Sequence, residues 1–380
     1  MKIDFNASPV SSLGIEVELE IVNRETRELH SAASEILPIM GEGHPDGEHP
    51  KAKHELLEST IEIITGVCTN VAEARRDLEG TLAEVQEHTN PRGLALMCSG
   101  SHPFSDWATQ EVTPNPRYAR LVEEMQWMAR RLQIFGIHVH VGIRSAEKAI
   151  AIANALSAYI PHFLALSASS PYWMGRDTGL ASARSKVFEG LPTAGLPYQL
   201  SGWDEFEQFM QTLVSANAIQ SIREVWWDIR PHPDFGTVEL RICDGIPTMS
   251  EIAAVAALSQ SLVEWMDSLV DRGYSLPMPR GWVVRENKWR AARHGIDAEI
   301  IVGDSGDNVV PICTALHELV EKLSPVAERL DCIKELRHCL TILDHGPSYL
   351  RQRALVEQGK TLPDVVDSLI REMETDEPSG

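Results

Sequence analysis

Four segments of the sequence alternate between apolar residues and side chains that can bind a metal ion or a phosphate group. In an extended strand, successive side chains point to opposite faces, so every second residue shares a face. An ordinary half-buried strand has Thr, Ser, Lys and mixed charges on its wet face instead of a concentration of ligands. The pattern therefore predicts a sheet with one apolar face under helices and one acidic face lining a site. The four segments are GIEVELEI (14–21), STIEII (59–64), GIHVHVGI (136–143) and GTVELRIC (236–243).

Carboxylates dominate the predicted polar face. Glu16, Glu18 and Glu20 lie on one face of the first strand. Clustered carboxylates raise one another's pKa unless cations neutralise them. Glutamates that alternate with β-branched residues also occur on solvated edge strands, and the first segment alone fits that interpretation equally well. Glu62 and Glu239 on two further strands favour a metal site. Carboxylate oxygens in this number suit magnesium or manganese better than zinc.

His138 and His140 share one face of the third segment. They are either two histidines satisfied inside the fold or a zinc-binding pair. A metal hydrolase needs further His or Asp ligands at the ends of repeated strand–helix units, and the sequence has no such repetition. Because carboxylates are expected nearby, one imidazole is better explained as a cation or phosphate ligand in a site made mainly of oxygen ligands.

Basic side chains gather in a loop, on two strands and in the segment VVRENKWRAARHG (283–295). That segment is either a solvated helix face or a substrate-binding loop, and arginine is suited to bidentate contacts with carboxylate and phosphate. The sequence has no G-x-x-x-x-G-K-[ST] phosphate loop and no G-x-S-x-G or activated-cysteine signature. Phosphoryl transfer needs mainly metal ions and positive charge, so the residues indicate ATP chemistry on a different scaffold. The basic residues are Arg176, Arg184, Lys186, Arg230, Arg241, Arg285, Lys288, Arg290 and Arg293.

The composition is that of a globular protein with an acidic surface. The 380 residues include 34 Lys and Arg against 55 Asp and Glu, a net charge of -21, which repels nucleic acid and anionic membranes. The N-terminus lacks a basic start before a long apolar run, so we expect no secretory signal. The apolar stretch 149–170 predicts a buried helix rather than a membrane span. Six scattered cysteines without a C-x-x-C pair predict reduced thiols in the cytoplasm.

No repeat, low-complexity tract or linker divides the chain, so we expect one α+β domain over residues 1–380. Its C-terminal part, about 311–375, is expected to be helical, and residues 375–380 are expected to fray. Helices are predicted after the caps Asn70, Ser145 and either Thr248 or Ser250, and from about 117 to 132. The predicted strands are 13–22, 58–64, 93–98, 135–143, 224–230 and 236–243. Three loops are predicted to form the rim of a site, namely 41–51, 175–200 and 276–307.

Seven motifs follow one another from about residue 12 to 300. They are LGIEVELEIVN, KHELLESTIEIITGVC, SGSHPF, GIHVHVGI, SSPYWMGRDTGLASARSKVFEGLPTAGLPY, PDFGTVELRICDGIPT and RENKWRAARHG. Together they resemble the carboxylate-amine ligases, the bacterial type 2 glutamate-cysteine ligase family. The resemblance implies a glutamine-synthetase-like fold, in which a largely antiparallel, curved sheet has a polar concave face and helices packed on the other face.

The resemblance also implies an ATP-dependent ligation with magnesium or manganese. In that family a substrate carboxylate takes the γ-phosphoryl group of ATP, and an amine attacks the acyl phosphate to give an amide, ADP and phosphate. L-Glutamate and L-cysteine are the default substrates, another amino compound remains open as the amine, and a homodimer is plausible. Two alternatives remain open, a small-molecule phosphotransferase on the same fold and a nucleotide-binding regulatory protein.

Site residues follow from the resemblance position by position. Arg241 is implied to contact phosphate or the acyl intermediate, with Arg184 and Arg290 as further catalytic candidates. Two departures from the family pattern occur: Val17 stands in the middle of the first acidic motif, where strand parity directs it towards the helices, and Met174 replaces a more usual polar residue. The implied nucleotide contacts are Arg241, Arg290, Lys288 and Arg176. The implied metal ligands are Glu16, Glu18, Glu62, His138 and Glu239.

Overall fold

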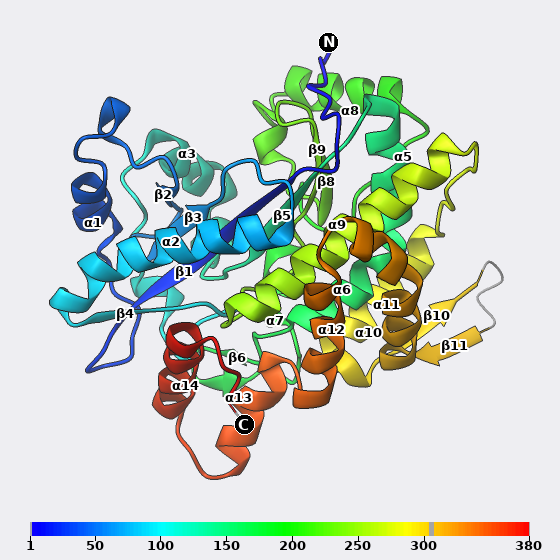
Figure 1. Ribbon diagram of the computed structural model, residues 1–380. Coiled ribbons are helices and arrows are strands. Elements are labelled where there is room, and N and C mark those ends of the chain that lie inside the picture. The colour runs from blue at the N-terminus through cyan, green and yellow to red at the C-terminus, as the bar shows by residue number, and fades with distance from the viewer. Residues whose placement is uncertain (1, 304–307, 380) are drawn as a thin grey trace.

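The computed structural model describes residues 2–303 and 308–379 and has at its centre a sheet whose strand pairings are all antiparallel (Figure 1). The strand order is β2-β3-β1-β5-β9-β8, and β4 pairs with the end of β1. Two small sheets, β6-β7 and β10-β11, lie outside it. The strands are β1 (Leu13–Asn23), β2 (Ala52–His54), β3 (Thr60–Ile64), β4 (Leu94–Met97), β5 (Ile137–Gly142), β6 (Tyr172–Trp173), β7 (Arg176–Asp177), β8 (Ile229–His232), β9 (Thr237–Leu240), β10 (Glu299–Val302) and β11 (Asn308–Pro311).

The apolar face of β1 forms part of the main hydrophobic core. Val17 lies opposite Ile63 of β3, and both side chains are 0% exposed. Strand parity predicted Val17 on the helix-packed face, and this prediction is confirmed. The burial also explains why an apolar residue in the middle of the first acidic motif is tolerated.

The other face of β1 is polar, and the pairing register aligns its carboxylates with those of its neighbours. Glu18 lies opposite Glu62 of β3, and Glu16 lies opposite His138 of β5. Because side chains alternate with a period of two, a slip of one residue would move all of them to the core face. The buried apolar set therefore fixes the position of the ligands.

Helices cover the apolar face, where α2 and α9 lie along the sheet (Figure 1). The side chains of Asn70, Ser145 and Thr248 cap α2, α5 and α9, as predicted, each accepting from a backbone N–H in the first turn. The α+β class is confirmed. The helices are α1 (Ala33–Met40), α2 (Val71–Thr89), α3 (Pro116–Met125), α4 (Trp127–Arg130), α5 (Ala146–Leu156), α6 (Ile160–Ser167), α7 (Ala183–Phe188), α8 (Trp203–Ser215), α9 (Met249–Asp271), α10 (Gly281–His294), α11 (Ile312–Arg329), α12 (Ile333–His345), α13 (Ser348–Glu357) and α14 (Leu362–Thr375).

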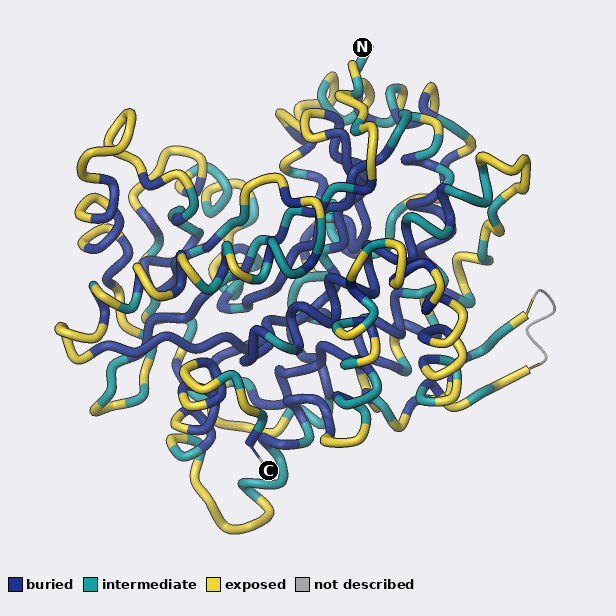
Figure 2. The backbone as a smooth tube through the Cα atoms, in the orientation of Figure 1, coloured by how far each residue is buried: buried dark blue, intermediate teal, exposed yellow. Residues whose placement is uncertain are grey.

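The long apolar stretch is interior, as Figure 2 shows for α5 and α6. The segment Ala146–Ser167 is long and apolar enough to cross a membrane, but 83% of its most apolar window is buried inside the fold. The prediction of a buried helix is confirmed, with a 3-10 turn (Ser157–Tyr159) between α5 and α6.

Two predicted loops contain helices instead. The loop 276–307 contains α10, and the loop 175–200 contains α7. The buried face of α10 includes the polar residues Asn287 and Lys288, so an apolar helical period is not visible in the sequence. The strand predicted at 224–230 begins only at Ile229, after a 3-10 turn (Ile222–Glu224).

The C-terminus is anchored rather than frayed, which contradicts the prediction for residues 375–379; Gly380 lies outside the described residues. Asp376 accepts from Arg75 (2.6 Å) and from the backbone N–H of Ser250 (2.8 Å) at the start of α9. Ser379 is buried and lies 2.6 Å from the hydroxyl oxygen of Ser368. A carboxylate at a helix N-terminus and an arginine together fix the chain end.

A buried ion-pair network joins α13 to α9 and α14. Arg351 donates to Glu251 (2.8 Å) and Glu372 (2.7 Å), and all three residues are buried. We predict that Arg351→Met lowers the free energy of unfolding by about 3–5 kcal/mol, because it leaves two buried carboxylates without a cation. Arg353→Met is the matched control. It removes a pair with the half-exposed Asp177 and should cost about 0–1 kcal/mol in urea titrations. Equal losses would contradict a structural role for the network.

Candidate active site

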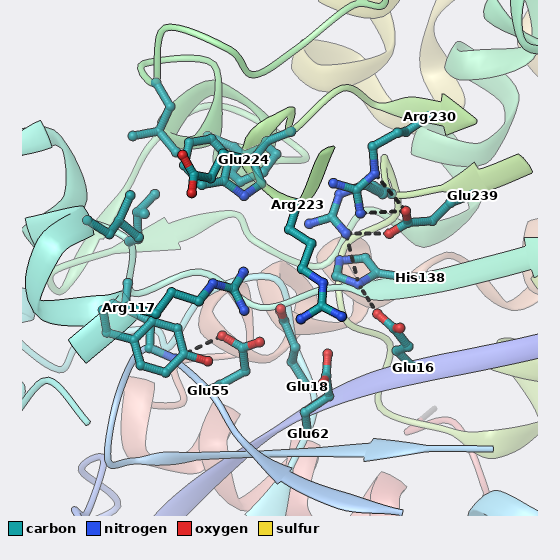
Figure 3. Close-up of a pocket in the computed structure, with 18 of the residues that line it drawn as sticks. Glu16, Glu18, Glu55, Glu62, Arg117, His138, Arg223, Glu224, Arg230 and Glu239 are labelled. Carbon is teal, nitrogen blue, oxygen red and sulfur yellow. Dashed lines mark hydrogen bonds and ion pairs between the residues drawn. The ribbon is translucent and has the colours of Figure 1, made fainter. Parts of the chain in front are cut away.

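A cavity of about 300 Å³ lies on the polar face of the sheet (Figure 3). Its floor is made by β1, β3, β5, β8 and β9, and its walls include α3 and residues 223–226. Of the three loops predicted to form the rim, 175–200 contributes lining residues, Phe188 and Leu191. Loop 41–51 and the described part of 276–307 contribute none, which corrects the prediction.

Glu18, Glu55 and Glu62 form an acidic triad in which one oxygen of each lies within 4.8 Å of the others. Burial raises the pKa of Glu18 to about 8, with a further contribution from Glu55. Burial, followed by repulsion from neighbouring carboxylates, raises the pKa of Glu62 well above its ordinary value, and burial also raises the pKa of Glu55. Without a neutralising cation, the triad therefore retains protons that exposed glutamates lose at neutral pH.

Glu16 lies between two histidines at one side of the triad. Its carboxylate is 2.8 Å from Nδ1 of His138 and 3.3 Å from Nε2 of His140. Burial opposes ionisation of Glu16, but the hydrogen bonds to the histidines outweigh it and hold its pKa well below the ordinary value. Burial, with the charge of Arg241, lowers the pKa of His138 to about 4. The His138 imidazole is therefore neutral at neutral pH and can offer a lone pair to a cation.

Glu239 is paired with two arginines. Arg230 donates to one carboxylate oxygen from Nε (2.8 Å) and Nη2 (2.6 Å), and Arg241 donates to the other oxygen. Burial opposes ionisation, yet the two guanidinium groups hold the pKa of Glu239 well below its ordinary value. One carboxylate oxygen of Glu239 also lies within 4.8 Å of ligand atoms of Glu16 and His140. Glu239 therefore remains ionised whether or not a cation is bound.

Arg117 and Arg223 bring positive charge into the cavity from two walls. Arg117 lies in the first turn of α3, and Arg223 lies in the 3-10 turn before β8. Figure 3 shows both guanidinium groups directed into the cavity. Neither forms an ion pair with a carboxylate of the described residues, whereas the neighbouring Arg120 lies 2.6 Å from Glu224. Two arginines in this position can bind phosphate or carboxylate oxygens.

The structure brings most of the predicted ligands to this one cavity. Sequence reasoning placed His140 on the correct strand face without selecting it, and it missed Glu55, Arg117 and Arg223. Glu55 lies in the motif KHELLESTIEIITGVC, just outside the predicted strand. Only the family motif, and not strand parity, could therefore have identified it as a site residue. The predicted residues that line the cavity are Glu16, Glu18, Glu62, His138, Glu239 and Arg241.

Arg184 and Glu20 lie beside the cavity rather than in its lining. The guanidinium of Arg184 donates to the carbonyls of residues 241 and 242, at 3.2 Å each, and its charge partly opposes the raised pKa of Glu18. Glu20 shares the strand parity of the ligands but is 0% exposed, and its carboxylate accepts from the Ser99 hydroxyl at 2.7 Å. Arg184 thus holds the backbone that follows β9 and adds positive charge near Glu18, and its catalytic role stays a prediction.

The three remaining basic candidates lie outside the lining of this cavity. Arg290 pairs with Glu286 at 2.9 Å on the same helix. Lys288 is buried and pairs with Asp228 at 2.6 Å. Arg176 is exposed in β7. None of the three lines this cavity, and their contact with a nucleotide stays a prediction.

The donor set fits a hard divalent cation. Carboxylate oxygens predominate, and Glu16, Glu62 and His138 form a second group of ligand atoms within 4.8 Å that shares Glu62 with the acidic triad. Magnesium and manganese prefer such oxygen-rich sites, with imidazole as an additional ligand. A cation there would offset the burial and the carboxylate repulsion that raise the pKa of the triad carboxyls.

We predict that Glu62→Gln stabilises the cation-free protein near pH 8. The unfolded carboxyl ionises above about pH 4.3, whereas burial and neighbouring carboxylates raise the pKa of the folded one, so the wild type loses stability as pH rises between the two pKa values. The variant cannot ionise at position 62, so its gain in stability over the wild type should shrink towards pH 5. Thermal unfolding of variant and wild type in EDTA between about pH 5 and pH 8 measures this gain, and the exposed Glu87→Gln serves as the control. Destabilisation of Glu62→Gln at every pH would contradict the assigned electrostatics.

Comparison with known proteins covers nearly the whole chain. The model of glutamate-cysteine ligase family 2 matches residues 12–368. A Frankia alni protein, provisionally named glutamate–cysteine ligase 2-1, is 58% identical over 379 residues, covering 100% of this chain and 99% of that protein. A Thermobifida fusca protein, provisionally named glutamate–cysteine ligase 2, is 51% identical and covers 100% of this chain and 95% of that protein.

Two solved structures share the fold at low sequence identity. The Francisella tularensis glutamate–cysteine ligase in complex with AMP has a TM-score of 0.69 at 14% identity, covering 98% of this chain and 90% of that one. A bifunctional glutathione synthetase from Pasteurella multocida has a TM-score of 0.69 at 15% identity; the match covers 97% of this chain but only 52% of that one. The extent and identity of the sequence matches show that this chain belongs to glutamate-cysteine ligase family 2.

Proposed function

We propose that the protein is an ATP-dependent ligase that joins L-glutamate to an amine, L-cysteine or another amino compound, through an acyl phosphate. The observation that carries this proposal is the combination, in one cavity, of an acidic triad with the guanidinium groups of Arg117 and Arg223. Membership of the family supports the ligase class, and the AMP complex of the Francisella enzyme supports a nucleotide substrate.

Each part of the cavity has a role in this proposal. The acidic triad, with Glu16 and His138, would hold magnesium or manganese. When bound, such a cation neutralises phosphate charge and so favours phosphoryl transfer. Glu239 would add an oxygen ligand while it fixes the guanidinium of Arg241, which faces the same cavity. Arg117 and Arg223 would orient anionic substrate groups at the opposite side.

The reaction proceeds in two displacements. An oxygen of the substrate carboxylate forms a bond to the γ-phosphorus of ATP, and the bond from that phosphorus to ADP breaks. The amine nitrogen then attacks the acyl carbon, phosphate leaves with the former carboxylate oxygen, and the amine loses a proton. Splitting the reaction replaces a poor hydroxide leaving group with phosphate. Arginines in a partly buried cavity stabilise the charge that develops, since low dielectric strengthens their field.

The remaining features of the chain fit this role. We take the whole chain to act as one catalytic domain, since α11 and α12 share the main core with α9. All six cysteines are unpaired, which supports a cytoplasmic enzyme. Small molecules are the expected partners, and a homodimer is retained from the family resemblance.

A phosphotransferase on this fold would release a stable phosphorylated product, and a regulatory protein would release none.

We predict that glutamate labelled with oxygen-18 in its reacting carboxylate transfers one label to inorganic phosphate during amide formation. The label follows because the oxygen that bonds to phosphorus leaves with it. Mass spectrometry of the phosphate and of the amide measures both products in one incubation with ATP, magnesium and a mixture of amines. Amide formed with unlabelled phosphate would contradict the acyl phosphate, and phosphorylated glutamate without amide would establish the phosphotransferase instead.

A further inference from the structure

A second cavity, of about 440 Å³, lies behind the wall of the candidate active site and shares no lining residue with it. Its lining includes residues of α7, α8 and α10 together with the loop 192–198. The segment VVRENKWRAARHG contributes Arg285, Lys288 and Trp289 to it. Residues of this motif therefore line the second cavity, whereas none of them lines the candidate active-site cavity.

One layer of backbone separates the two cavities. The backbone N–H of Trp226 donates to the carbonyl of Thr193 (3.0 Å), and the N–H of Asp228 donates to that of Gly195 (2.7 Å). Side chains alternate along such extended backbone. Trp226 accordingly lines the active-site cavity, whereas Trp227 lines the second cavity. We name this layer the partition: residues 188–195 and 224–228.

Aromatic rings form one side of the second cavity. The ring of Trp227 lies 4.9 Å from that of Phe209 and 5.7 Å from that of Tyr198. Trp289 lies on α10, and the ammonium group of Lys186 is 5.5 Å from its ring centroid. Tyr198 and Trp289 are 62% and 43% exposed, so their rings are open to a ligand. Surfaces of this kind stack on planar rings.

One cation in the second cavity has no counter-charge among the residues that the structure describes. Lys186 pairs with Glu189, and the buried Lys288 pairs with both Glu189 (2.7 Å) and Asp228 (2.6 Å). Arg285 has no ion pair or hydrogen bond with the side chains and carbonyls of residues 2–303 and 308–379. It lies four residues before Trp289, so both side chains occupy the same face of α10. A guanidinium beside exposed aromatic rings matches an anion attached to a planar ring.

We propose that the second cavity binds a planar aromatic ligand carrying a phosphate or a carboxylate, with the anion on Arg285 and the ring against Trp289, and that its occupation regulates the active site. The regulatory part rests on the proposed function. Lys288 joins α10 to both segments of the partition, through Glu189 and through Asp228. A ligand that fixes α10 against the partition therefore biases the position of the residues on its other side. The coupling is reciprocal, so active-site ligands alter affinity at the second cavity by the same factor.

Equilibrium dialysis in EDTA tests the site with two probes, AMP for the phosphate and indole-3-acetate for the carboxylate. EDTA removes the cations on which nucleotide binding at the acidic triad depends. We expect one probe to bind at one site per chain, about tenfold or more tighter than its neutral counterpart, adenosine or indole. Arg285→Gln and Trp289→Leu should each weaken binding about tenfold or more, because each removes one of the two contacts. The exposed Arg285 can be replaced without disturbing the core, which keeps the test valid if Trp289→Leu folds poorly.

Two controls separate this site from the active site. Arg290→Gln, on the same helix but outside both linings, should leave binding unchanged, and so should Arg223→Gln in the active-site cavity. Binding that survives Arg285→Gln but is lost in Arg223→Gln would overturn the proposal, as would the absence of binding by both probes.

The kinetic arm uses the bound probe as an effector. We expect it to change the KM for glutamate in the wild type but not in Arg285→Gln, and an unchanged KM would overturn the regulatory part. Probe binding in a protein without ligase activity would refute the proposed function and leave the ligand site standing. Ligase activity without probe binding would refute the ligand site alone.

Discussion

The burial of three neighbouring carboxyl groups, Glu18, Glu55 and Glu62, is the constraint on which the rest of the structure depends. Three carboxyl groups within reach of one ion cannot all ionise in a partly buried cavity, so they retain protons or bind a cation. Burying such a group costs free energy, because its charge is no longer solvated. The large apolar core under the sheet offsets this cost and keeps the carboxylates in place. Under the proposed function, the site would be ready for a cation before any substrate arrives.

Some charges in the cavity are paired within the sheet, and others are not. Glu239 is neutralised internally by Arg230 and Arg241, and Glu16 is held ionised by hydrogen bonds from histidine. Arg117 on α3 and Arg223 in the turn before β8 add positive charge that has no ion-pair partner among residues 2–303 and 308–379, and both elements lie outside the sheet. If cations neutralise the acidic triad, an anionic substrate could bind between them and the two arginines. It would then contact positive charge on both sides. In the proposed function, strands would supply most of the cation ligands, and connecting segments would supply the anion contacts.

Strand parity predicted much of the site because it is a local property of the sequence. It placed Glu18 and Glu62 together and directed Val17 into the core, and the register confirms that arrangement. Arg117 and Arg223 could not be predicted in this way, since their approach to the cavity depends on how a helix and a turn pack over the sheet. The sequence left α10 open between a helix face and a loop because its buried face includes Lys288, whose partners Asp228 and Glu189 are distant in sequence. Sequence periodicity identifies a face of an element but not the tertiary partner of a polar side chain.

Proton release on cation binding tests the central claim most directly. Calorimetric titration of the metal-free protein with magnesium near pH 7, in buffers of different ionisation enthalpy, counts the protons released. The raised pKa values of Glu18 and Glu62 predict release of about one proton or more per chain, and a smaller release from Glu62→Gln. Magnesium binding without proton release, or with the same release in wild type and variant, would contradict the account of the acidic triad as a protonated cation site.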